Sequence, residues 1–201
     1  MDTLLWIDVE TTGLDPDSDA LLEIGMLYTD GGLHPIDAPL DLVLRWDGTP
    51  DDFIKGMHGP NGLLDACRHG LEPKEAYRLA GEYAHRREAL VAGSTVRFDR
   101  GMLDAHDPRI LAGLGHRSLD VSALDEAARL WNPACRDARP ERTTDHRCLH
   151  CLDDSIRLAR HELVKLFVFG VCFINRVPFV RGMRPRVGRG PVSSWSLCAP
   201  R

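Results

Sequence analysis

Apolar residues near the start of the chain fall into short runs separated by turn-forming stretches. Such runs occur at residues 3–9, 21–28 and 40–46, and the last two are joined by the segment TDGGLHPIDAP, which is rich in Gly, Pro and Asp. Short apolar runs bounded by turn residues are typical of strands. We therefore predict a three-stranded meander in this part of the chain.

Farther along, the apolar spacing alternates between that of helices and that of strands. We predict helices at residues 50–58, 72–89, 98–105, 122–131 and 145–164, and short strands at residues 90–96 and 117–121. Ser122 is the expected N-cap of the helix at 122–131. A meander followed by alternating strands and helices predicts an α/β fold, in which a mixed sheet of antiparallel and then parallel strands is flanked by helices.

The overall composition is that of one globular domain. The 201 residues are 43% hydrophobic and 27% charged, which is enough for a substantial core. The first ten residues, MDTLLWIDVE, contain neither a basic region nor a long apolar segment, so we expect no signal or transit peptide, no membrane association and a cytoplasmic location. The six cysteines are scattered along the chain, so we expect free thiols rather than a disulfide framework.

Charge divides the chain into two parts. Residues 165–201 contain seven Lys or Arg and no Asp or Glu, whereas residues 1–164 contain 18 basic and 30 acidic side chains. We therefore predict a domain at 1–164 and a basic extension, rich in Gly, Pro and Arg, at 165–201. The apolar run VKLFVFGVCFI in the extension is too short to span a bilayer. The extension either contacts nucleic-acid phosphates or is a lineage-specific or out-of-frame addition.

Two carboxylates emerge from the first predicted strand, in the stretch WIDVETTGLD. Asp8 and Glu10 are two residues apart, so their side chains point to the same face of the strand. Two acids beside an apolar strand are costly unless a cation compensates them. The pair therefore predicts a divalent metal site, and the alternative is a strand end whose acids reach solvent.

The same stretch resembles the first motif of the DEDDh 3′-to-5′ exonucleases, which have an RNase H-like fold. A second stretch, AGSTVRFDRGML at residues 92–103, resembles the motif in which this family places its third metal-binding acid. The resemblance implies that Asp99 is that acid; the alternative is an acid that only stabilises a helix N-terminus.

Two further stretches, HRSLDVSALDEAARLW and FIKGMHGPNGLL, resemble the oligoribonuclease branch of the family, which degrades very short RNA. This resemblance implies that His58 contacts the terminal nucleotide and that Leu14 and Phe53 pack against bases, unless those two are ordinary core residues. The branch usually has Trp in place of Phe53. In place of His116 it has a Tyr that reaches the substrate across a dimer interface, so a homodimer is expected as well.

The last motif departs from the family pattern of His, four residues, then Asp. In TTDHRCLHCLDDSIRLARHEL, His146 aligns with the His, but Cys151 occupies the position of the acid. We predict that His146 is the general base and that Asp154, one helical turn after Cys151, is the fourth metal ligand. His150 as the base and Asp153 as the ligand remain alternatives.

Two cysteines in this stretch, Cys148 and Cys151, form a C-x-x-C pattern with histidines nearby. Such a pattern can bind zinc if a further ligand such as Cys135 joins it, but an inert helix or a redox role fits it too.

The resemblance as a whole implies a metal-dependent nuclease of short single-stranded RNA. Two divalent cations, Mg²⁺ or Mn²⁺, would clamp the attacking and leaving oxygens of the phosphodiester. His146 would take a proton from the attacking water, and the 3′-terminal nucleotide would leave as a 5′-monophosphate. The alternatives are a catalytically impaired nucleic-acid-binding homologue and a DNA proofreading or trimming exonuclease.

Overall fold

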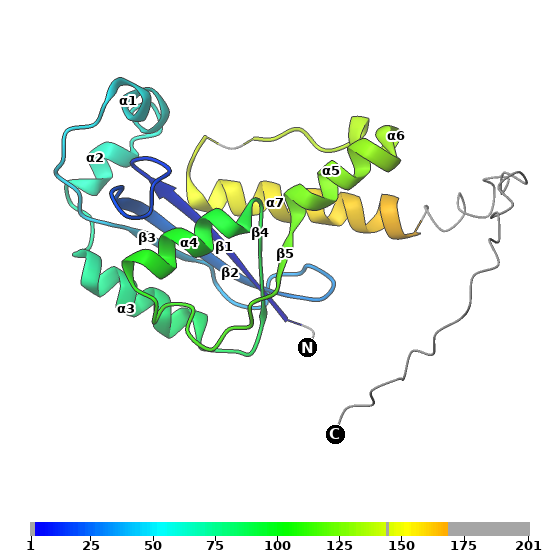
Figure 1. Cartoon of the computed structure of the whole chain (residues 1–201), viewed down its shortest axis with the longest axis horizontal. Coiled ribbons are helices and arrows are strands. Elements are labelled where there is room, and N and C mark those ends of the chain that lie inside the picture. Colours follow the sequence, from blue (N-terminus) through cyan, green and yellow to red (C-terminus); the bar gives the residue numbers. More distant parts are fainter. Residues whose placement is uncertain (1–2, 144, 169–201) are drawn as a thin grey trace, which may run out of the picture.

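A five-stranded mixed sheet lies at the centre of the molecule (Figure 1). The computed structural model describes residues 3–143 and 145–168. In chain order the strands are β1 (Thr3–Thr11), β2 (Leu21–Asp30), β3 (Leu40–Val43), β4 (Leu90–Gly93) and β5 (Ser118–Asp120), and they lie side by side in the order β3-β2-β1-β4-β5. The first three are antiparallel, whereas β4 and β5 run parallel to β1. The predicted mixed sheet is therefore confirmed.

Helices cover both faces of this sheet (Figure 1). They are α1 (Asp52–His58), α2 (Leu63–Cys67), α3 (Pro73–Ala84), α4 (Val96–His106), α5 (Val121–Trp131), α6 (Pro133–Asp137), α7 (Cys148–Glu162) and the π-helix η1 (Leu163–Val168). Buried side chains of α3 and α4 share one apolar cluster with the sheet, and those of α7 and the start of α5 share a second. Within the described part of the chain, no helix is long and apolar enough to cross a membrane.

Alternate residues of β1 belong to opposite faces of the sheet. Leu5, Ile7 and Val9 are buried in the cluster with α3 and α4, whereas Trp6 is buried in the cluster with α7. The two-residue period therefore places Asp8 and Glu10 on the face of Trp6, under α7.

The close approach of α7 to this face depends on a glycine. Gly25 on β2 is the register partner of Asp8, and a Cβ atom at Gly25 would come within 2.5 Å of the Cβ of Cys148. No side chain larger than hydrogen fits between the strand and the first turn of α7. Gly25 thus allows the residues of α7 to reach the carboxylates on β1.

The N-cap of α5 differs from the prediction. Asp120, the last residue of β5, accepts a hydrogen bond from the Ser122 backbone N–H at 3.0 Å, and it also accepts one from the Ser122 hydroxyl at 2.6 Å. The chain passes directly from strand to helix here, so residue 120 holds the capping position and Ser122 already lies inside the helix. The prediction of Ser122 as the cap was wrong.

Several elements are shorter than predicted. The strand predicted to end at 96 ends at Gly93, because the left-handed backbone of Thr95 (φ 61°) leads into α4. The last long helix begins at Cys148 rather than at 145. The predicted boundary at residue 164 falls within η1, and residues 169–201 of the predicted extension lie outside the described residues.

Candidate active site

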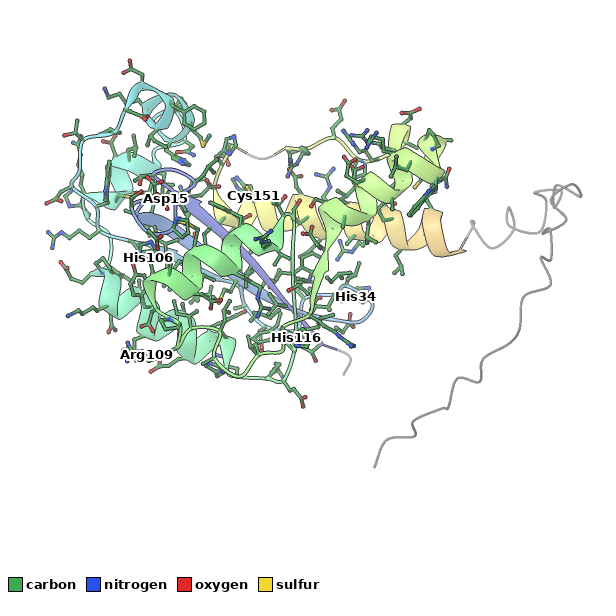
Figure 2. All side chains as sticks on the ribbon, in the orientation of Figure 1. Asp15, His34, His106, Arg109, His116 and Cys151 are labelled. Carbon is green, nitrogen blue, oxygen red and sulfur yellow. The ribbon has the colours of Figure 1, made fainter. Side chains whose placement is uncertain are left out.

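The two carboxylates of β1 lie next to a cysteine thiol of α7, and not next to a carboxylate of that helix. The ligand atoms of Asp8, Glu10 and Cys151 all lie within 4.8 Å of one another. The Cys151 thiol donates a hydrogen bond to Glu10 Oε1 at 3.6 Å. Figure 2 shows Cys151 near the start of α7, beside the carboxyl end of β1. We call these three residues the β1–α7 cluster.

Asp99 approaches β1 from α4. Its Oδ1 accepts a hydrogen bond from the Val9 backbone N–H at 3.0 Å, at a point where β1 has passed beyond its pairing with β4. Asp99 is 4% exposed, so its carboxylate is buried against β1. The structure thus brings Asp8, Glu10 and Asp99 together, as the two sequence motifs predicted.

The three acids lie in surroundings that penalise their charged forms. Burial, followed by the charges of Asp99 and Glu10, raises the pKa of Asp8 well above its usual value. Burial also raises the pKa of Glu10 to about 7, although the hydrogen bond from the Cys151 thiol lowers it. The pKa of Asp99 is likewise raised by burial to about 7. Moreover, Asp8 Oδ2 is buried and has no hydrogen-bond partner among the described residues. Crowded carboxylates with a free oxygen fit a bound divalent cation, which would compensate their charge.

Two histidines lie next to this cluster. His58, at the end of α1, is fully buried, and its Nε2 lies 3.7 Å from Glu10 Oε2. The ring of His146 meets that of His58 edge-on, with the ring centroids 6.3 Å apart. Burial, followed by the neighbouring His146, lowers the pKa of His58 and so favours its neutral form. The structure therefore places His58 beside Glu10 and His146 against His58.

The segment that carries His146 is tied to the loop after α1. The Asn61 side-chain amide donates hydrogen bonds to the backbone carbonyls of Asp145 and His146, both at 2.8 Å. His146 itself has φ 61°, a left-handed conformation that costs a non-glycine residue free energy. The Asn61 contacts help to hold this conformation, and they explain how the rings of His146 and His58 come together.

The start of α7 is anchored to β2 by a buried acid that the sequence analysis did not single out. Glu23 is fully buried; its Oε1 accepts hydrogen bonds from the Arg147 guanidinium at 2.5 and 2.8 Å, and its Oε2 accepts one from the Cys148 backbone N–H at 2.8 Å. These bonds satisfy a free N–H group at the helix start and set its position over the sheet. The signal in the sequence was an acid inside the apolar run LLEIG.

The residues expected to pack against bases are on the surface. The exposed fraction is 82% for Leu14 and 67% for Phe53. The alternative that these two side chains are core residues is therefore wrong. Their contact with nucleotides remains a prediction.

Asp154 does not join the β1–α7 cluster. Its carboxylate accepts hydrogen bonds from the Thr143 backbone N–H at 2.7 Å and hydroxyl at 3.0 Å, and it pairs with Arg157 at 3.0 Å. Three residues of helix move a side chain about 4.5 Å along the axis. The prediction of Asp154 as the fourth ligand is corrected, because the structure brings Cys151 to the acids instead.

The alternatives in the same stretch are also placed away from the acids. Asp153 is exposed, and the His150 ring pairs with Asp145 at 2.7 Å while 60% of its side chain is exposed. His146, with its ring against His58, is therefore the better placed of the two candidate bases.

Changing Asp154 to Asn should lower stability more than activity. The substitution weakens two hydrogen bonds from Thr143 and the ion pair with Arg157, so we expect the free energy of unfolding to fall by about 1–3 kcal/mol. Urea unfolding measures this loss. Under conditions in which the variant is fully folded, its rate of oligonucleotide cleavage should stay within about threefold of that of the unmodified chain. Loss of cleavage in a folded Asp154→Asn protein would show that Asp154 is a metal ligand after all.

The metal-free protein should become more stable as the pH falls from 8 to about 6.5. The pKa values of Glu10 and Asp99 are raised in the folded state, so the stability that their protonation contributes is present at low pH and is lost as the pH rises through about 7. We expect a gain of more than about 1 kcal/mol in unfolding free energy over this interval. At pH values below this interval, His58 has the opposite effect. Its pKa is lowered in the folded state, so the unfolded chain takes up a proton there more readily and the unfolding free energy falls.

Urea unfolding in the presence of a chelator, repeated with excess Mn²⁺, measures this pH effect. The cation should hold the carboxylates ionised and remove most of the pH dependence. If the unfolding free energy of the metal-free protein does not change between pH 8 and 6.5, the pKa values of Glu10 and Asp99 are not raised in the folded state.

Comparison with known families places most of the chain within one of them. Residues 5–155 match the model of the RNase_T family, described as exonuclease. The chain is 37% identical over 165 residues to an oligoribonuclease of Leifsonia xyli, covering 78% of this chain and 80% of the relative. It is also 37% identical over 177 residues to an oligoribonuclease of Streptomyces griseus, with coverage of 83% and 88%.

Solved structures of exonuclease I share the fold. One of them superposes with a TM-score of 0.68 at 17% identity, and it covers 88% of this chain and 44% of its own. The E. coli exonuclease I complex with a dT13 oligonucleotide superposes with a TM-score of 0.63 at 18% identity, with coverage of 88% and 44%. The chain thus spans less than half the length of these proteins, and the likeness shows a common fold.

Proposed function

This chain belongs to the exonuclease family, and on that premise we propose that it is a metal-dependent 3′-to-5′ exoribonuclease that shortens small single-stranded RNAs to nucleoside 5′-monophosphates. The observation that carries the proposal is the β1–α7 cluster, whose donor atoms lie within 4.8 Å of one another. Asp99 and His58 lie beside it. The chain that holds this cluster is 37% identical to two oligoribonucleases.

The ligand set that we propose contains three carboxylates and one thiol. Asp8, Glu10, Asp99 and Cys151 would hold divalent cations at the carboxyl end of β1. Bound cations would supply charge compensation for the phosphodiester and would lower the pKa of water. The protein's part is to keep the carboxylates close together before substrate arrives, which the Val9–Asp99 hydrogen bond and the packing of α7 achieve.

The histidines have separate proposed roles. His146 takes a proton from the attacking water; its ring packs edge-on against His58, which adjoins Glu10, and its backbone is held by Asn61. His58, buried against Glu10, contacts the terminal nucleotide, and the exposed Leu14 and Phe53 offer apolar surface to bases.

The thiol in the ligand set suggests which cation the enzyme uses. Mg²⁺ prefers hard oxygen ligands in octahedral geometry, whereas thiolates favour softer ions. With Cys151 in place of a carboxylate, we propose that Mn²⁺ supports catalysis better than Mg²⁺.

Digestion of matched short oligonucleotides tests the proposed function. RNA and DNA of two to seven nucleotides, labelled at the 5′ end, are incubated with Mn²⁺, with Mg²⁺ or with a chelator. We expect a ladder of labelled RNA products that shorten from the 3′ end, faster with Mn²⁺, and no cleavage with the chelator. Binding without shortening would indicate a catalytically impaired homologue, and preferred cleavage of DNA would indicate a trimming nuclease.

We also propose a homodimer. His116 precedes β5, at the end of the sheet opposite Cys151, as Figure 2 shows. A residue there cannot reach the carboxylates of its own chain, so a substrate contact would require His116 of the partner subunit. Light scattering of the purified protein measures the mass in solution and tests this proposal. The expected cytoplasmic location remains a prediction.

The basic extension should be dispensable for cleavage. We propose that residues 1–164 form the exonuclease domain, because the family match ends at 155 and the acids, His58 and His146 all precede that point. A chain ending at residue 164 should stay folded and cleave short RNA at a similar rate, with at most a salt-sensitive loss of affinity. Unfolding of the shortened chain, measured by circular dichroism, would show that the extension belongs to the core.

A further inference from the structure

A second group of metal-binding side chains lies at the other end of α7, about 15 Å along the helix axis from Cys151. It consists of Cys135 on α6 and of His161 and Glu162 in the last turn of α7, and we call it the α6–α7 cluster. One donor atom from each residue lies within 4.8 Å of the others. None of these residues belongs to the proposed nuclease site, so the cluster needs its own explanation.

The carboxylate of Glu162 lacks the partners that its burial requires. Glu162 is fully buried, and its Oε1 has no hydrogen-bond partner in the part of the chain that the structure describes. Among the described residues, its Oε2 accepts a single weak hydrogen bond, from the Cys135 thiol at 3.5 Å. A buried carboxylate with a free oxygen is costly unless a positive charge lies beside it.

The distances within the cluster match a zinc site. Cys135 Sγ lies 3.6 Å from His161 Nε2 and 3.5 Å from Glu162 Oε2. A tetrahedral zinc ion with its usual bond lengths to sulfur, nitrogen and oxygen holds such donor atoms about 3.6 Å apart. We infer that Cys135, His161 and Glu162 bind Zn²⁺, with a water molecule completing the four ligands.

The surrounding charges allow a divalent cation at this place. Asp125 faces Cys135 and Glu162, but it is already paired with Arg139 at 2.9 Å and with Arg136 at 3.5 Å. Lys165 also faces Cys135. The thiolate of Cys135 and the carboxylate of Glu162 therefore supply the two negative charges that balance Zn²⁺.

Binding requires the loss of one proton. Without metal, the Cys135 thiol donates to Glu162, and His161 Nε2 lies 2.8 Å from the Cys135 carbonyl oxygen. When Zn²⁺ binds, the thiol releases its proton to solvent. The His161 ring stays neutral: Nε2 gives up to solvent the proton that it donates to the Cys135 carbonyl, Nδ1 takes one up, and Nε2 turns to the cation. The bound ion would join α6 to the end of α7 through Cys135 and His161, which are 26 residues apart in the chain.

Metal titration of the full-length protein tests the site. The chain carries Cys151→Ser, Cys172→Ser and Cys198→Ser, which removes the thiol of the β1–α7 cluster and those of the extension, and the thiols that stay besides Cys135, those of Cys67 and Cys148, are fully buried. Co²⁺, a spectroscopic substitute for zinc, should give a thiolate-to-metal charge-transfer band that saturates at one ion per chain and disappears on adding Zn²⁺. Zn²⁺ should also raise the midpoint of thermal unfolding by about 5 °C more in this background than in the same chain carrying Glu162→Gln.

Two further variants in the same background locate the ligands. Cys135→Ser should abolish the band, and Glu162→Gln, which keeps the thiol and the side-chain shape, should weaken Zn²⁺ binding at least tenfold. Because Glu162→Gln removes a buried charge, it should fold even if Cys135→Ser does not. Absence of the band in the starting background, or its persistence in Cys135→Ser, or unchanged affinity in Glu162→Gln, would overturn the inference. Cleavage of RNA is not part of this test, so its outcome is independent of the proposed function.

Discussion

Changing Asp8 to Ala should reduce RNA cleavage at least about a thousandfold while stabilising the metal-free protein. Asp8 shares its face of β1 with Glu10, and its Oδ2 is buried without a partner among the described residues. Burial and, after it, the neighbouring acids raise the pKa of Asp8. The substitution removes a proposed cation ligand and relieves the repulsion among the remaining acids. The rate of 3′ shortening with saturating Mn²⁺ measures the first effect, and urea unfolding with a chelator at pH 8 measures the second.

Asp153→Ala is the matched control, since Asp153 is an exposed acid on α7 outside the β1–α7 cluster. It should change neither the cleavage rate nor the pH dependence of stability. Cleavage retained in Asp8→Ala would remove Asp8 from the catalytic site. Unfolding of Asp8→Ala at pH 8 would show instead that the carboxylate supports the fold.

Changing Cys151 to Asp should raise the cleavage rate with Mg²⁺ at least about tenfold, and it should reduce the advantage of Mn²⁺. The thiol of Cys151 lies 3.6 Å from Glu10 Oε1, so a carboxylate at this position supplies the oxygen ligand that Mg²⁺ prefers. Cys151→Ser, which offers only a weak hydroxyl ligand, should lower the rate with both cations. Initial rates across a titration of each metal measure these changes.

A spectroscopic signal separates a ligand from a nearby thiol. In a background with Cys135→Ser, Cys172→Ser and Cys198→Ser, Cd²⁺ should give a thiolate-to-metal charge-transfer band that Cys151→Asp and Cys151→Ser both remove. Combining Cys151→Asp with Asp154→Asn should give additive effects, because Asp154 is held by Thr143 and Arg157 and serves a different role. A rate with Mg²⁺ that is unchanged in Cys151→Asp would exclude residue 151 from the metal site.

The sequence by itself determined the fold class and the grouping of three acids, Asp8, Glu10 and Asp99. The two-residue period of a strand places Asp8 and Glu10 on one face, and this placement does not depend on the tertiary structure. Asp99 follows a short strand and lies in the first turn of the next helix, so it too is placed by local structure. The order of strands and helices likewise predicted the mixed sheet.

Only the tertiary structure decided which residue of α7 meets these acids. A helix presents several side chains within one turn, and its rotation and height over the sheet depend on contacts distant in the chain. Here the hydrogen bonds of Glu23 to Arg147 and Cys148, and the space above Gly25, bring Cys151 to Glu10 and leave Asp154 on another side. The same long-range packing brings Cys135 to the end of α7, because residues 26 apart become neighbours only once both helices lie against α5.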